Sequence, residues 1–284
     1  MNLKKQKKKN ISNRIISVVL LGVIAFSGYN LYTGFQDYWK DYEKSLHINE
    51  AASRNQKTVN WKKLRKKNKD VIGWIYCPGT VIDYPIVQGK DNDTYLHTGV
   101  DGAWSGAGTL FVDCANDNPF QEYNTVIYGH HMRDGSMFHD LDDWKDKNHL
   151  KKHPVFYLYT PTQNYELKIL CWNNVSATDT TVYGVPFDEE AMGKYIEMIK
   201  KAPVKTKEAS DISEADPIVT LSTCAYTFKD ARSILACKVV PVDKSIQDIE
   251  SSKPKPDSKF TVFCRMIKEI IIEGISDIQN GESE

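Results

Sequence analysis

The chain has 284 residues, enough for one sizeable domain with appendages or for two small domains. Its 37 basic and 37 acidic residues balance, so the overall charge gives no support for nucleic acid as a partner. The six cysteines are widely scattered and form no Cys-x-x-Cys pair, which argues against a compact disulfide framework. The composition is that of a globular protein with a packed core.

The N-terminus has the pattern of a membrane-targeting segment. Five lysines and Arg14 lie within the first fourteen residues, and an apolar run from Ile15 to about Tyr32 follows. A membrane span needs about 17–25 mainly apolar residues, so residues 1–32 are predicted to be a basic tail and a signal anchor. A cleaved signal peptide is the alternative, but no clear small-x-small cleavage site follows the run. Because basic residues stay in the cytoplasm, the rest of this single-pass cell-membrane protein is expected outside the cell.

The next segments change from a helical to a β-rich pattern. Residues 33–69 are rich in charge, with apolar side chains at helical intervals, which predicts a helical stalk. Residues 70–242 contain short β-rich runs separated by turn residues, which is typical of a sandwich or a closed barrel. These runs are Val71–Tyr76, Val81–Val87, Thr109–Val112, Thr125–Tyr128, Val155–Tyr159, Tyr165–Trp172, Ile218–Ser222 and Ile234–Val240.

Two amphipathic helices are expected in the second half of the chain. The first spans Phe187–Lys201, where five apolar residues can share one face and acidic residues occupy the first turn. The second ends the chain, after a linker, within residues 243–284. Its apolar side is expected to hold Phe263, Met266, Ile267, Ile270, Ile271 and Gly274.

The strongest chemical signal is a cysteine at the end of a predicted strand. Cys224 ends the run that begins at Ile218, and Arg232 opens the following run, so the two side chains can face each other across a hairpin. A fixed cation beside a thiol favours the thiolate. His130 and His131 also follow a predicted strand, where a histidine could transfer protons. From the residues alone, an activated nucleophile and a buried inert thiol both remain open.

Several motifs resemble those of one enzyme family. Thr220-Leu-Ser-Thr-Cys224, with Arg232 eight residues later, resembles the active-site signature of the sortases, and Tyr128-Gly-His-His-Met132 resembles their histidine motif. Asp70-Val-Ile-Gly-Trp74 and Ile82-Asp-Tyr-Pro85 resemble the opening strands of class B sortases. The resemblance covers about residues 61–240.

The resemblance implies a mainly β fold: an eight-stranded sortase-type barrel with N-terminal helices and a helix between the sixth and seventh strands. The extra C-terminal helix, after about Ser258, departs from the family pattern. The resemblance also implies that Cys224 is the nucleophile, His130 its proton-transfer partner and Arg232 an electrostatic stabiliser. Its suggested substrate-binding residues are Asn92, Leu96, Thr178, Tyr183 and Ser222.

The implied activity is that of a cysteine transpeptidase. It would cleave an Asn-Pro-x-Thr-Gly/Asn-like sorting motif of exported proteins after Thr, through a thioester, and transfer the protein to a peptidoglycan amine. No cofactor is expected. No metal site is expected either, because His130, His131 and His139 lack a recognised ligand spacing.

Other functions remain to be compared with this one. A pilin-polymerising sortase and a non-catalytic anchored barrel that binds peptides or wall polymers are the alternatives. A papain-like protease would place its cysteine early and before its histidine, whereas here His130 precedes Cys224. The Ser-His-Gly-Cys-type string of L,D-transpeptidases is not present around Cys224.

Overall fold

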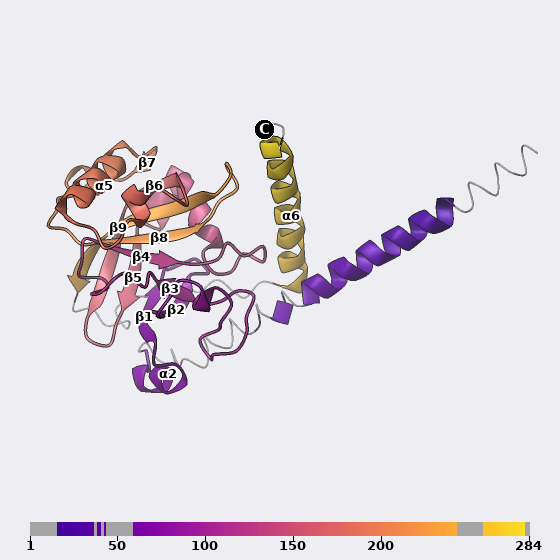
Figure 1. Ribbon diagram of the computed structural model, residues 1–284, viewed down its shortest axis with the longest axis horizontal. Coiled ribbons are helices and arrows are strands. Elements are labelled where there is room, and N and C mark those ends of the chain that lie inside the picture. Colours follow the sequence, from indigo (N-terminus) through magenta and orange to yellow (C-terminus); the bar gives the residue numbers. More distant parts are fainter. Residues whose placement is uncertain (1–15, 37–38, 41–42, 44–58, 243–257, 282–284) are drawn as a thin grey trace, which may run out of the picture.

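The computed structural model describes residues 16–36, 39–40, 43, 59–242 and 258–281 (Figure 1). The predicted basic tail, most of the predicted stalk and most of the predicted linker lie outside these residues. In the described part of the predicted stalk, residues 33–36 continue the N-terminal helix, and one short helix, α2 (Trp61–Lys67), precedes the β domain. Asn60 caps it, because its side-chain oxygen accepts a hydrogen bond from the Lys63 backbone N–H at 2.9 Å.

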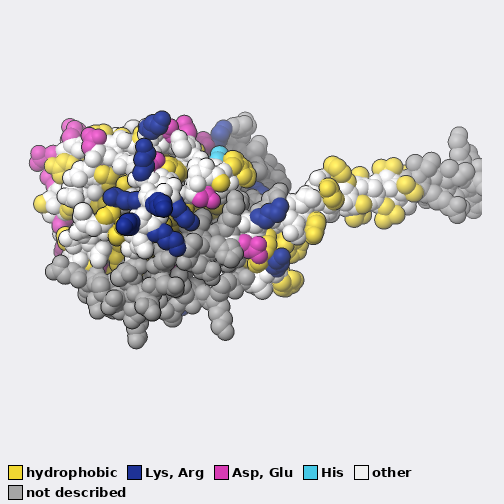
Figure 2. Space-filling model, turned by 90° about the horizontal axis from the view of Figure 1, so that it is seen from below, with side chains coloured by type: hydrophobic (Ala, Val, Ile, Leu, Met, Phe, Trp, Pro, Cys, Tyr) yellow, Lys and Arg dark blue, Asp and Glu magenta, His cyan; other side chains and the backbone are white. Residues whose placement is uncertain are grey.

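The N-terminal helix, Ile16–Gln36, is long and apolar enough to cross a membrane. None of its apolar window is buried within the protein. Figure 2 shows apolar side chains along the length of this helix, which extends away from the β domain. An exposed apolar helix of this kind is a candidate membrane span, as the composition predicted.

Eight strands close into a barrel, as expected. The order along the sheet is β5-β1-β2-β3-β4-β8-β9-β6-β7, and β5 also pairs with β6, which closes a ring of eight strands. β7 is a two-residue addition on the outer edge of β6, too short to be recognised in the sequence. The strands are β1 (Val71–Tyr76), β2 (Asp83–Val87), β3 (Leu110–Val112), β4 (Asn124–Tyr128), β5 (Val155–Tyr159), β6 (Asn164–Ser176), β7 (Val204–Lys205), β8 (Ile218–Cys224) and β9 (Ala231–Val242).

Strand alternation divides the apolar residues between two cores. Along β9, Leu235 and Cys237 point into the barrel, whereas Ile234 and Ala236 belong to a second cluster. Helix α5 (Glu189–Lys201) covers that second cluster. Along the chain, α5 comes after the sixth barrel strand, β6, and before the seventh, β8. The helix predicted over residues 187–201 is therefore confirmed, and its five expected apolar residues are all buried.

Short helical segments occupy connections that showed no clear pattern in the sequence. They are η1 (Thr94–Leu96), η2 (His139–Lys145), α3 (Lys147–Lys152), α4 (Thr180–Tyr183) and η3 (Glu208–Ser210). Each is a turn or two long, which is too short for a hydrophobic period to be recognised. η2 nevertheless contributes to the barrel core, because Leu141 and Trp144 are fully buried.

The C-terminal helix α6 (Lys259–Gly281) is present, but its contact face differs from the predicted one. Val262, Met266 and Glu269 are buried, whereas Ile270 and Ile271 are exposed. Val262 and Met266 form a small apolar cluster with Phe35, at the end of the N-terminal helix. The predicted face was therefore right for Met266 and Phe263, which pack in this cluster, and wrong for Ile270 and Ile271, because apolar periodicity does not reveal which neighbours a helix meets. Figure 1 shows α6 beside the barrel, rising from the end of the N-terminal helix.

Candidate active site

Cys224 is the last residue of β8, at the rim of the barrel. It pairs directly with Arg232, near the start of β9, in an antiparallel register. Its side chain is half-buried, whereas Cys77, Cys171 and Cys237 are buried in the barrel wall and interior. Burial raises the pKa of both Cys77 and Cys171 to about 12, so these thiols stay protonated at neutral pH. Cys224 therefore combines access to solvent with a neighbouring cation.

His130 reaches the same rim because β4 runs parallel to β8. The register pairs Tyr128 with Ser222, and the Gly129 N–H donates a hydrogen bond to the Ser222 carbonyl at 3.0 Å. His130 and Cys224 each follow this last pair by two residues, so both lie at the same rim of the barrel. Only a glycine fits at position 129 without rearrangement, because a Cβ atom there would clash with the side chains of Leu110 and Phe138.

The His130 ring is held in one tautomer. Its Nε2 lies 2.8 Å from the Leu96 carbonyl oxygen, which can only accept, so Nε2 carries the hydrogen and Nδ1 keeps a lone pair. The His97 ring stacks on His130 with 5.6 Å between centroids. Burial lowers the pKa of His130; the hydrogen bond to Leu96 opposes this effect, and the charge of His97 adds to it. His130 is therefore a neutral base at neutral pH.

Tyr183 lies against the same rim. Its hydroxyl is 2.8 Å from the Ser222 Oγ, and its ring stacks on Tyr128 at 6.1 Å. Burial raises the pKa of Tyr183 to about 12; the Ser222 hydrogen bond and the charge of Arg232 lower it, whereas the charge of Cys224 raises it. Two of the predicted substrate-binding residues, Tyr183 and Ser222, thus neighbour Cys224. Ser222 itself is only 1% exposed and presents its hydroxyl to Tyr183.

The other predicted residues have different surroundings. The Leu96 carbonyl holds His130, as described above. Asn92 connects two loops: its Oδ1 accepts from the Cys114 N–H at 2.8 Å, and its Nδ2 donates to Asp113 Oδ2 at 3.0 Å. Thr178 is exposed in the loop after β6, where its hydroxyl lies 3.0 Å from that of Ser176.

Three residues of this region were not singled out from the sequence: His97, Asp113 and Tyr128. Asp113 accepts hydrogen bonds from both Asn92 and the Tyr128 hydroxyl, the latter at 2.8 Å. It thereby links the loop that contains Asn92 to the strand that leads to His130. Tyr128 begins the histidine motif and could have been selected on that ground; His97 and Asp113 gave no signal, since their contacts arise only in the fold.

The amino-acid sequence matches the Sortase domain family over residues 75–240. The chain belongs to the sortase family. Sortases are cysteine transpeptidases, so the predicted enzyme class is confirmed. The resemblance to class B is confirmed as well, because the relatives found are sortase B proteins.

Two curated relatives cover most of the chain. Sortase B of Listeria monocytogenes serovar 1/2a is 36% identical over 82% of this chain and 99% of its own length. Sortase B of Staphylococcus aureus is 28% identical over 80% of this chain and 96% of its own length. Among solved structures, sortase B from B. anthracis has a TM-score of 0.63 at 29% identity and covers 73% of this chain and 100% of its own. The sortase barrel is thus shared in both sequence and fold.

Proposed function

We propose that Cys224, His130 and Arg232 form the catalytic centre of this sortase, and that it transfers exported proteins to a cell-wall amine. The observation that carries the proposal is the strand register. Parallel pairing of β4 with β8 ends at Tyr128 and Ser222, two residues before His130 and Cys224, and antiparallel pairing of β8 with β9 sets Arg232 opposite Cys224. A half-buried thiol with an imidazole and a guanidinium beside it would be an activated nucleophile.

In the first half-reaction, His130 Nδ1 takes the proton of the Cys224 thiol, and the thiolate attacks the carbonyl carbon of threonine in the sorting motif. The carbon–nitrogen bond then breaks, and the protonated His130 gives its proton to the leaving amine. A thioester remains on Cys224. In the second half-reaction, the acceptor amine attacks the thioester and loses a proton to His130, and the released thiolate regains that proton.

Arg232 would stabilise the oxyanion that forms in each half-reaction. One of its nitrogens, Nη1, donates to the Ala231 carbonyl at 3.0 Å. A guanidinium has five N–H donors, so others remain for a substrate oxygen. The rigid β8–β9 pairing fixes the backbone of Arg232, which lowers the cost of placing that charge.

The proposed substrate is the Asn-Pro-x-Thr-Gly/Asn-like motif of an exported protein, and the proposed acceptor is a peptidoglycan amine. The helix Ile16–Gln36 would anchor the enzyme by a single pass, with the basic N-terminus in the cytoplasm and the barrel outside the cell. Asn92, Leu96, Thr178, Tyr183 and Ser222 are proposed to contact or support the bound motif. Of these, Tyr183 is near enough to Cys224 for the charge of that cysteine to raise the pKa of its hydroxyl.

The decisive experiment is to trap the thioester. The full-length enzyme in detergent would be incubated with an Asn-Pro-x-Thr-Gly peptide without acceptor, and digested fragments analysed by mass spectrometry. The expected product is an acyl group ending in threonine on the fragment that contains Cys224, released when an amine is added. An adduct on Cys114 or Cys264, the other accessible cysteines among the described residues, would overturn the assignment. Binding without any adduct would favour the non-catalytic barrel.

A further inference from the structure

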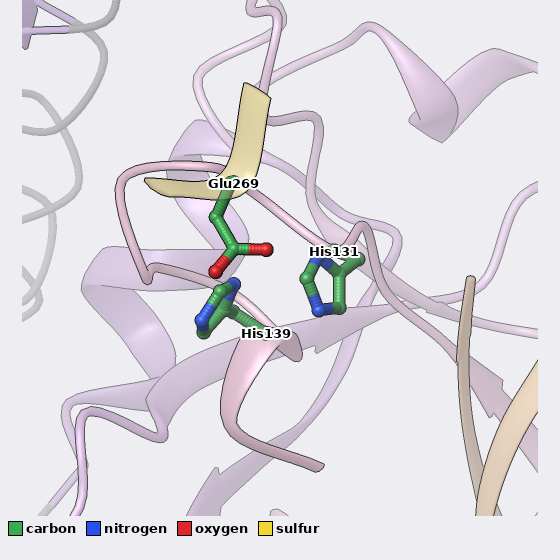
Figure 3. Close-up of side chains that lie close together, drawn as sticks. All are labelled: His131, His139 and Glu269. Carbon is green, nitrogen blue, oxygen red and sulfur yellow. The ribbon is translucent and has the colours of Figure 1, made fainter. Parts of the chain in front are cut away.

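A second cluster of reactive side chains lies next to the proposed catalytic centre. His131, His139 and Glu269 each offer a ligand atom, and the three atoms lie within 4.8 Å of one another. Figure 3 shows the Glu269 carboxylate, from helix α6, directed toward the two imidazole rings. The two histidines come from the segment that follows β4, and Glu269 lies about 130 positions later in the chain.

The fold fixes the two histidines on one tight segment. Residues 131–138 form a turn closed by a hydrogen bond from the Phe138 N–H to the His130 carbonyl at 3.0 Å and by a bridge between His131 and Met137. His139 follows as the first residue of η2. Both rings therefore face the same space, 4.3 Å apart between centroids.

Helix α6 is held against this turn by other contacts. Arg265 Nη1 donates a hydrogen bond to the Asp134 carbonyl at 2.6 Å. Met266 is buried, and Phe263 packs edge-on against Phe35 of the N-terminal helix, with 5.3 Å between ring centroids. These contacts place Glu269, one turn beyond Arg265, over the two histidines, where it is only 7% exposed.

We propose that His131, His139 and Glu269 bind one Zn²⁺ ion, which joins helix α6 to the segment that follows the catalytic histidine. Two imidazole nitrogens and one carboxylate oxygen are a ligand set that Zn²⁺ favours, with water in the fourth position. Tetrahedral ligands around zinc are about 3.4 Å apart, given bonds of about 2.1 Å. Small side-chain rotations would bring the three groups to that spacing.

The state of His139 suits a metal ligand. Its ring donates a hydrogen bond to the Met132 backbone, while its Nδ1 is buried and has no hydrogen-bond partner among the described residues. A ligating histidine commonly donates its other N–H to a backbone carbonyl in this way.

Nearby charged side chains influence how tightly the site can bind a cation. Arg265 and Lys268 both act on His139 and disfavour an added cation. The Glu269 carboxylate supplies the opposing charge, which makes it the ligand on which metal affinity should depend most. Zinc rather than magnesium or calcium is expected, since those ions prefer all-oxygen sites.

The position of the site suggests what the metal would do. His131 is covalently next to His130, and its ring meets Tyr226, two residues after Cys224, edge-on at 5.3 Å. The same helix α6 contacts the end of the candidate membrane span. A bound zinc would therefore fix the catalytic-histidine segment relative to the membrane-proximal helices. It would be a structural ion, distinct from the sulfur chemistry at Cys224.

The test is metal binding by the full-length enzyme in detergent. After treatment with a chelator, ZnCl₂ would be titrated by calorimetry, and CoCl₂ absorption would report the coordination geometry. Wild type should bind one equivalent, with a tetrahedral cobalt spectrum and an increased melting temperature. Glu269→Gln, which keeps the side-chain shape, and His139→Ala should each weaken Zn²⁺ binding by more than about 100-fold, beyond the usual effect of an outer hydrogen-bond partner.

Matched controls make the result decisive. Glu189→Gln changes an exposed carboxylate on α5. His149→Ala changes one of two neighbouring histidines, His149 and His153, that form no three-ligand group with a carboxylate among the described residues. Both controls should bind Zn²⁺ like wild type. Circular dichroism of Glu269→Gln without metal should match that of wild type, which excludes misfolding as the cause. Equal Zn²⁺ affinity in wild type and Glu269→Gln, or no bound equivalent in wild type, would overturn the site.

Discussion

The β8–β9 hairpin holds two cysteines with opposite properties. Cys237 pairs with Val219 near the end of the ladder that is far from the connecting loop, where complete burial raises the pKa of its thiol well above the ordinary value. Cys224 lies at the loop end of the same hairpin, half-buried and paired with Arg232. The same residue type on the same two strands is thus inert in the interior and accessible at the rim. Position along a strand, rather than residue type, decides which thiol can react.

Replacing each cysteine in turn tests most directly whether Cys224 is reactive and Cys237 inert. Cys224→Ala should abolish acyl transfer and remove the Cys224 fragment from iodoacetamide labelling, with little change in stability. Cys237→Ala should retain transfer and lose about 0.5–3 kcal/mol of unfolding free energy, the usual range for a core change. Peptide mapping would separate Cys224 from the exposed Cys114 and Cys264. Retained activity in Cys224→Ala would end the case for a nucleophile at the rim.

The two cations of β9 give the next largest contrast. Arg232 pairs with Cys224, whereas Lys238 lies six residues further along and forms an ion pair with Asp216 at 2.6 Å. Arg232→Ala should reduce the acylation rate about 100–1000-fold, as loss of an oxyanion donor does, without unfolding the barrel. Lys238→Ala should leave the rate near that of wild type. Single-turnover kinetics with a sorting-motif peptide would measure both, and equal rates in the two variants would exclude Arg232 from the reaction.

Gly129 tests how closely the barrel supports His130. An added methyl group would collide with the Phe138 ring, so Gly129→Ala should cost about 1–3 kcal/mol, the usual penalty of overpacking. It should also displace His130 and slow transfer. The exposed Gly102, also in a loop, has a positive φ but open space around its Cβ position, which makes Gly102→Ala a control for backbone strain alone. Chemical denaturation would compare the stabilities of Gly129→Ala and Gly102→Ala. An unchanged transfer rate in a folded Gly129→Ala would show that close packing at Gly129 is not needed to position His130.

The smallest expected effect concerns the protonation of His130. Burial lowers its pKa, and the stacked His97 contributes to that burial and adds a like charge. In His97→Ala the midpoint of the His130 titration should therefore rise toward the ordinary histidine value, and more imidazolium should be present at a given pH. NMR titration of the ring would measure this midpoint. His149→Ala should leave it unchanged, whereas a fall in His97→Ala would contradict the assigned cause.

Much of the fold was predictable because its signals are local. All eight barrel strands and helix α5 were located from β-rich runs and helical periodicity, since a strand or amphipathic helix records its buried face in its own sequence. The segments that escaped prediction, such as η2 and α4, are too short to contain a full period. Part of the apolar face of α6 was mispredicted because the exposed Ile270 and Ile271 have the same sequence pattern as a buried pair, whereas Met266 and Phe263 do pack.

The sequence by itself determined the sortase family, the strands and three candidate catalytic residues, because motifs and strand patterns are properties of neighbouring residues; the barrel followed from the family resemblance. Only the tertiary structure decided which groups lie near one another: the Leu96 carbonyl that fixes the His130 tautomer, and Glu269 within 4.8 Å of His131 and His139. These contacts join segments separated by 34 to about 138 positions. Nothing in a local pattern encodes such a meeting, because it depends on how the barrel closes and where the last helix packs.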